Sequence, residues 1–457
     1  MNSKPKQFPS KYSRAFEWRV AKGDVPFTAH LKGLGALAAS ENRDILLDYY
    51  EISRKRRTDR TALFKLQSHL FEDLLDLENG NKLWKMKVED IKGTMVSSGT
   101  SANNEELEEA EGQLFGHRLY ANVIRLIVDG IVWRAFNYDR AALNVLSRAS
   151  TKQHLSATGT AQEIREWAHH YSDSTVAIAV LNSLSNWLAL GDVTVIKTDG
   201  SAEILEVKSG KSTSRRMQRQ KHRMSEAVTL LGGGPGEFDG TPIKFTRIEG
   251  CPEHGLSELG KLLQEAQKKG WAMARLSNCL FVECVDFVAL DVSGPQWQKE
   301  FEEKRAGAIS YWYKQGDFVV EGESHELLTF SPNCAPLSIF PFSSATCMDL
   351  MLGTKAYRSY LNVSAIGREF EYRGWRILKT PQDFHDEGVL HRRLFQFEKY
   401  GSALTLSTTS LRRIQMEMVR PQTLIRESEA IRYAGPSAFP VGTGQSFVFE
   451  SEGSMWD

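Results

Sequence analysis

The chain is poor in cysteine, has no net charge and lacks a long apolar segment. Its 457 residues include five cysteines, too few and too odd in number for a disulfide framework. The N-terminus contains charges but no apolar core, so no secretory signal is predicted. The most apolar runs, 123–136 and 176–190, are too short or too interrupted to match the roughly 20 apolar residues of a membrane helix. The sequence therefore predicts a cytoplasmic protein with reduced thiols and no membrane segment.

The absence of net charge excludes a polycation that coats nucleic acid over its whole surface. The chain carries 57 basic and 57 acidic residues, yet a local basic face is enough to neutralise phosphates. The two signs are unevenly distributed, since residues 105–111 are rich in glutamate and residues 208–223 are rich in lysine and arginine. Nucleic-acid binding therefore depends on where the positive charge is gathered.

The chain is long enough for two to four domains of about 100–200 residues each. Leucines recur at helical spacing in the first part, and short β-branched runs replace this pattern further on. We predict an α/β chain of the α+β type. Its predicted parts are a helical region at 1–96, a linker at 97–112, a central domain at 113–295, a C-terminal α/β region at 296–433 and a mobile tail at 434–457.

The centre of the chain changes its periodicity after Gly191. Before it, Thr175–Leu190 is apolar nearly all round, which predicts a buried helix. After it, two short β-branched runs flank Asp199-Gly200, a strong hairpin signal. A basic helix is predicted at Thr213–Leu231, and a buried strand at Leu280–Val288.

The predicted hairpin brings candidate metal ligands together. Asp192 opens its first strand, and after thirteen further residues the second strand ends in Glu206-Val207-Lys208. The start of one strand and the end of the next lie side by side in a hairpin, and Glu206 and Lys208 share one face. Two carboxylates and a backbone carbonyl are hard oxygen ligands suited to Mg²⁺ or Mn²⁺. A lysine beside such a metal can orient or deprotonate a water, or stabilise a negatively charged phosphate.

This pattern of Asp192 and Glu206-Val207-Lys208 on two strands, followed by a polar helix, resembles the PD-(D/E)XK nuclease superfamily over roughly residues 160–250. The resemblance implies a restriction-endonuclease-like core. It implies that Asp192, Glu206 and the Val207 carbonyl bind the metal and that Lys208 is catalytic. The family's first motif is usually Pro-Asp, whereas this chain has Gly-Asp.

The same resemblance implies two further helix residues. Many members carry a glutamine on the helix after the lysine. Gln218 and Gln220 occupy that place, and Gln220 is the preferred candidate catalytic residue because it shares a helix face with Arg216 and Arg223. Many members also carry an upstream helix glutamate, for which Glu163 and Glu166 are both candidates. The family core has four strands. Only three are evident between 190 and 250, so Leu280–Val288 is a candidate for another.

The segment after the candidate metal site is strongly basic. Seven positive residues and no acidic one lie within 208–223. They are Lys208, Lys211, Arg215, Arg216, Arg219, Lys221 and Arg223. A helix with this face can follow a phosphate backbone. Lys211, Arg215, Arg216, Arg219 and Arg223 are therefore predicted to bind DNA, with RNA left open.

The predicted function is a divalent-metal-dependent endodeoxyribonuclease. Nuclease cores attached to larger regions resemble bacterial restriction or anti-phage defence effectors, an inference by analogy. A homo-oligomer or a partner subunit of a defence complex is consistent with that analogy. Two alternatives stay open at this point, a catalytically inactive nucleic-acid-binding module and a structural subunit of a larger assembly.

Overall fold

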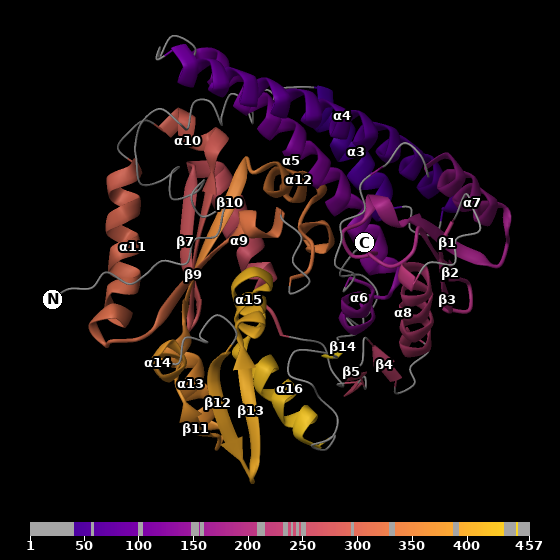
Figure 1. The fold of residues 1–457 in the computed structure, drawn as a ribbon. Coiled ribbons are helices and arrows are strands. Elements are labelled where there is room, and N and C mark those ends of the chain that lie inside the picture. The colour runs from indigo at the N-terminus through magenta and orange to yellow at the C-terminus, as the bar shows by residue number, and fades with distance from the viewer. Residues whose placement is uncertain are drawn as a thin grey trace.

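The protein is an α+β chain in a computed structural model (Figure 1). The residues described are 41–55, 59–98, 104–147, 155, 160–207, 215–231, 236–238, 241–243, 246–247, 253–293, 297–328, 334–386, 393–433 and 445–446. Lys208, Lys211 and most of the predicted tail at 434–457 lie outside these residues. None of the described helices is long and apolar enough to cross a membrane.

Long helices form the N-terminal part. They are α3 (Glu41–Lys55), α4 (Arg60–Ser98), α5 (Asn104–Ala135) and α6 (Arg140–Leu146). In Figure 1, α4 and α5 run side by side along one edge of the molecule. They pack through leucines at helical spacing, such as Leu63, Leu66 and Leu70, which are buried. Within the predicted linker, residues 97–98 end α4 and residues 104–112 begin α5.

A small antiparallel sheet follows, in the order β1-β2-β3. Its elements are α7 (Thr160–Ser172), β1 (Val176–Leu181), η1 (Asn182–Leu184), β2 (Val193–Lys197), β3 (Ala202–Leu205) and α8 (Arg215–Leu231). The predicted hairpin is confirmed, since Val193 pairs with Leu205 and Gly200 has a φ of 84° in the turn. The predicted basic helix is confirmed as α8.

The predicted helix over Thr175–Leu190 is wrong. This segment forms β1 and a short 3-10 turn, and β1 pairs with β2 along its length. A run that is apolar on every side looks the same to periodicity whether it is a buried helix or a buried strand. The tertiary partner decides here, because the buried Gln67 side chain of α4 donates to Ala179 O at 3.0 Å and accepts from Leu181 N at 3.3 Å.

A second antiparallel sheet has the order β7-β8-β10-β9. Its strands are β7 (Trp271–Ser277), β8 (Leu280–Asp286), β9 (Val319–Glu323) and β10 (Lys355–Asn362). The helices in this part are α9 (Leu256–Lys269), α10 (Phe287–Ser293), α11 (Trp297–Lys314) and α12 (Ser344–Leu352). The predicted strand at Leu280–Val288 is confirmed as β8, but it pairs with β7 and β10 and adds nothing to the first sheet. The sheet therefore joins segments from both sides of the predicted boundary at 295/296.

The remaining elements complete the C-terminal part. They are α13 (Val363–Tyr372), β11 (Arg376–Lys379), α14 (Pro381–Asp386), β12 (Arg393–Lys399), β13 (Ser402–Ser407), α15 (Thr408–Glu417) and α16 (Pro421–Tyr433). β11, β12 and β13 form a third antiparallel sheet. Short pairs join β4 (Gly236–Phe238) to β5 (Thr241–Ile243) and β6 (Thr246–Arg247) to β14 (Gln445–Ser446), and η2 (Ser324–Leu328) and η3 (Leu337–Ile339) are short turns.

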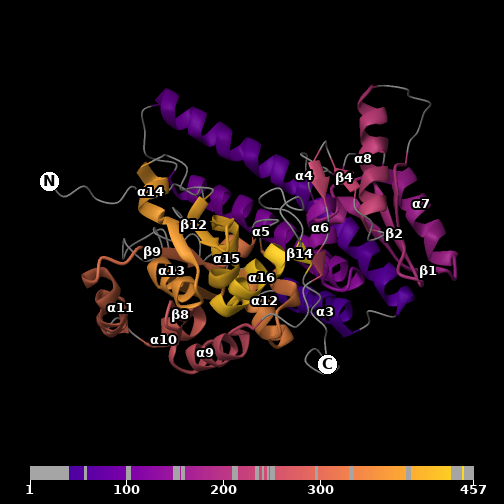
Figure 2. The same cartoon turned by 90° about the horizontal axis from the view of Figure 1, so that it is seen from below.

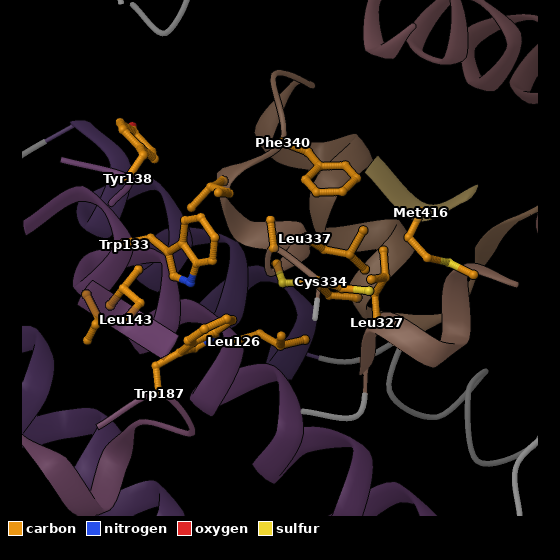
Figure 3. Close-up of a cluster of buried hydrophobic side chains, with 14 of the residues drawn as sticks. Leu126, Trp133, Tyr138, Leu143, Trp187, Leu327, Cys334, Leu337, Phe340 and Met416 are labelled. Atoms are coloured by element: carbon orange, nitrogen blue, oxygen red, sulfur yellow. The ribbon is translucent and has the colours of Figure 1, made fainter. Parts of the chain in front are cut away.

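One hydrophobic core connects the N-terminal helices to the C-terminal part. Figure 3 shows this junction, where Trp133 and Trp187 face Leu337 and Phe340. The rings of Trp133 and Trp187 meet edge to face with centroids 5.0 Å apart. Because this cluster draws on distant parts of the chain, the helices and the sheets share a common core.

Candidate active site

Asp192 and Val207 lie beside each other at one end of the first sheet. Gly191-Asp192 leads into β2, and the Asp192 N–H donates to Leu205 O at 2.7 Å. The Asp192 carboxylate in turn accepts a hydrogen bond from the Val207 N–H at 2.7 Å. The antiparallel register that pairs Val193 with Leu205 brings these residues together.

Gly191 is required by the backbone at this end. Its φ is +69°, a left-handed conformation that glycine adopts without strain. A Cβ at this position would lie 2.7 Å from both the Ile204 side chain and Leu205 O. Proline is excluded because its ring fixes φ near −65°. The backbone therefore accounts for Gly-Asp in place of Pro-Asp.

Gln220 from α8 contacts Glu206. The Gln220 Nε2 donates to Glu206 Oε2 at 2.5 Å. Gln218, the alternative glutamine, is exposed on the same helix. This hydrogen bond fixes one oxygen of the Glu206 carboxylate and positions α8 against the end of β3.

Glu163 from α7 joins the same acidic cluster. One helical turn further on, the buried Trp167 anchors α7 to the sheet by donating from Nε1 to Ala179 O at 3.0 Å. Residues four apart share a helix face, so Glu163 faces the sheet as well. Partial burial, together with the negative charges of Asp192 and Glu206, raises the pKa of Glu163 to about 7.

Glu166, the other candidate glutamate, is directed elsewhere. Its Oε1 lies 3.3 Å from Nε2 of His170, one turn along α7. The structure therefore favours Glu163 as the upstream carboxylate.

The basic residues of α8 divide into different environments. Arg219 is exposed, whereas Arg223 is half-buried with its guanidinium 5.5 Å from the ring centroid of Phe238. Arg223 therefore contributes to packing as well as to charge. Arg215 and Arg216 lie in the first turn of α8.

The carboxylate oxygens of this site are hard ligands, which suit a hard divalent cation. Within the described part of the chain, no three histidine, cysteine, aspartate or glutamate side chains form a ready metal cluster. The pKa of Glu163 is raised mainly by partial burial and further by the negative charges of Asp192 and Glu206, so the three carboxylates lie close enough to interact. Carboxylates are the ligands that Mg²⁺ and Mn²⁺ prefer, so Asp192 and Glu206 fit this role, with Glu163 as a neighbouring carboxylate.

The raised pKa makes Glu163 a source of pH-dependent stability in the absence of metal. Between about pH 4.5 and pH 7 the folded chain binds more protons at Glu163 than the unfolded chain, so the free energy of unfolding falls as the pH rises. We expect Glu163→Gln to reduce this fall. The measurement is denaturant unfolding in EDTA at about pH 5 and about pH 8.

Glu166→Gln on the same helix is the matched control, because Glu166 faces His170. The wild-type slope should persist in this control. An unchanged slope in Glu163→Gln would contradict the raised pKa of Glu163 in the folded chain.

The strand β1 is the part of this site that sequence reasoning missed. The β-branched residues Val176, Ile178 and Val180, two apart, were the available signal for a strand.

Comparisons of the chain with protein-family models, with curated proteins and with solved structures gave no match.

Proposed function

We propose that the chain is a divalent-metal-dependent endodeoxyribonuclease with a restriction-endonuclease-like core formed by α7, β1–β3 and α8. The observation that carries the proposal is the convergence of Glu163, Asp192, Glu206 and Gln220 from four different elements at one end of the sheet. A structural hairpin needs none of these polar groups there. Phosphodiester hydrolysis requires oxygen ligands for a metal and groups that handle protons.

In this proposal Asp192, Glu206 and the Val207 carbonyl hold Mg²⁺ or Mn²⁺. When bound, the metal polarises a phosphoryl oxygen and lowers the pKa of a coordinated water. Gln220 holds the Glu206 carboxylate in place through the 2.5 Å hydrogen bond. With a pKa of about 7, Glu163 can hold or release a proton near neutral pH. Lys208, next to Val207 in sequence, is assigned to orient or deprotonate the attacking water.

The test is a cleavage assay on supercoiled, linear and single-stranded DNA and on RNA, with Mg²⁺, Mn²⁺ or EDTA. DNA cleavage that requires the metal and is lost in Lys208→Ala supports the proposal. Binding of DNA without cleavage under every condition would instead favour the inactive nucleic-acid-binding module. The suggested role as a restriction or anti-phage defence effector rests on analogy alone.

The basic face of α8 is proposed to contact the DNA backbone. Replacing the exposed Arg219 with alanine should weaken DNA binding and reduce the slope of log K against log salt by about 0.9 for one lost phosphate contact. Fluorescence anisotropy at several salt concentrations measures this slope.

Lys261→Ala on α9 is the matched control, because it removes an exposed positive charge away from the candidate site. Equal losses in both variants would mean that general charge, rather than the α8 face, determines DNA binding.

A further inference from the structure

A polar cavity lies far from the acidic site. It has a volume of about 710 Å³ and lies between α11, α13 and the turn that joins β7 to β8. Figures 1 and 2 place α11 and the β1–β3 sheet at opposite sides of the molecule. Ligand pockets usually have volumes of about 300–1,000 Å³, so this one is large enough for a small organic ligand.

Two exposed aromatic rings from different helices line this cavity. Tyr311 of α11 has 60% of its surface exposed and Tyr372 of α13 has 84% exposed. Large aromatic side chains gain little from a position in water, and their flat faces suit stacking on another ring. A third aromatic residue, Trp312, also lines the cavity and is 2% exposed.

Two arginines of the cavity are held in place by the protein. The Arg275 guanidinium lies 5.0 Å from the ring centroid of Trp312 and donates to Ala308 O at 2.9 Å. Arg368 donates to both oxygens of Asp317, at 2.8 and 3.1 Å. A guanidinium has five N–H donors, so each arginine keeps further donors for a ligand. Because the protein already orders both side chains, a ligand loses little affinity to ordering them.

The remaining polar groups limit the kind of ligand. Asn278 and Gln315 add amide donors and acceptors, and Glu369 adds a carboxylate. The two arginines are balanced by Asp317 and Glu369, so the cavity has no large excess of positive charge. This balance disfavours a ligand that places several charged groups inside the cavity, and it favours a ligand portion with an aromatic ring, hydrogen-bonding edges and a single negatively charged group.

We propose that this cavity binds one nucleotide unit, with the base against the rings of both Tyr311 and Tyr372 and the phosphate near Arg275 and Arg368. A base presents a flat π-face together with hydrogen-bonding edges, and a phosphate accepts from guanidinium donors. The unit comes either from a free nucleotide or from a single strand of nucleic acid. The inference does not depend on the proposed nuclease activity, because it concerns binding at a different side of the molecule.

The test is binding by the full chain of the common nucleoside monophosphates and, separately, of a short single-stranded oligonucleotide. Isothermal titration calorimetry is made on the wild type, Tyr311→Ala and Tyr372→Ala. Each alanine should weaken binding about tenfold, the loss expected when one stacking ring is removed. Tyr313→Ala is the matched control, because Tyr313 is 52% exposed on α11 but does not line the cavity.

The two ligand arms identify the source of the nucleotide. If a nucleoside monophosphate binds and both cavity variants weaken its binding, the proposal is supported and the ligand is a free nucleotide. If only the oligonucleotide binds and both variants weaken its binding, the proposal is supported and the ligand is a unit of a single strand of nucleic acid. The proposal is overturned if binding of neither ligand depends on Tyr311 and Tyr372. It is also overturned if Tyr313→Ala weakens binding as much as Tyr311→Ala and Tyr372→Ala do. Since all three tyrosines are exposed, their replacement should leave the hydrophobic core intact, so a loss of binding is not explained by unfolding.

Discussion

Asp192→Asn should reduce metal-dependent DNA cleavage by about a thousandfold or more. The substitution removes the negative charge of a proposed metal ligand, and metal stabilisation of the transition state contributes several kcal/mol. The shape of the side chain is kept, and its amide oxygen can still accept the hydrogen bond from the Val207 N–H. The fold should therefore survive while the activity is lost. Initial cleavage rates at saturating Mg²⁺, with circular dichroism of the purified variant, measure both.

The same hairpin provides controls of matched chemistry. Asp199→Asn changes an exposed aspartate in the turn, where it accepts from Ser201, and should leave cleavage unchanged. Glu206→Gln should behave like Asp192→Asn, whereas Glu203→Gln, on the same strand but paired with Lys197, should not. Full cleavage by Asp192→Asn would rule out this carboxylate as a metal ligand, and equal losses in all four variants would indicate general damage to the hairpin.

Trp133→Ala should destabilise the whole protein by about 3–5 kcal/mol, the range for truncating a large buried aromatic residue. Trp133 is fully buried, packs against Trp187 and lies 5.2 Å below the guanidinium of Arg140. In Figure 3 it stands at the junction between the N-terminal helices and the C-terminal part. Loss of this ring leaves a cavity in a core that both parts share.

The measurement is urea unfolding followed separately by tryptophan fluorescence and by circular dichroism. Both signals should shift together to lower denaturant if the junction belongs to one cooperative core. Leu83→Ala, at a position that is 69% exposed on α4, should change the free energy of unfolding by less than about 0.5 kcal/mol. A shift confined to one part of the protein would show that the parts unfold independently.

Local patterns were sufficient where the chemistry is encoded within a few neighbouring residues. The Asp199-Gly200 turn predicted the β2–β3 hairpin, because glycine adopts the positive φ that this turn contains. The spacing of Leu259, Leu262, Leu263 and Ala266 is that of one helix face, and these residues are the buried face of α9. The candidate residues Asp192 and Glu206 followed from the hairpin, since strand pairing alone brings its two open ends together.

Other features depend on partners that are distant in sequence. The segment after Thr175 became β1 because β2 and the Gln67 side chain satisfy its backbone. The shared helix face already favoured Gln220 over Gln218, whereas the choice of Glu163 over Glu166 depends on how α7 docks on the sheet. The strand β8 joined a different sheet from the one expected, because its partner β10 (Lys355–Asn362) lies far along the chain.

The sequence by itself determined the residue types of the acidic site, the hairpin that presents them and the basic helix that follows. These are short-range properties, set by backbone preference, side-chain charge and the alternation of faces along a strand. Only the tertiary structure decided which upstream helix glutamate lies near Asp192 and Glu206, where β1 and β8 belong and that a tyrosine- and arginine-lined cavity exists between α11 and α13. The physical reason is that these features arise from packing between segments far apart in the chain, and local propensity does not encode that packing.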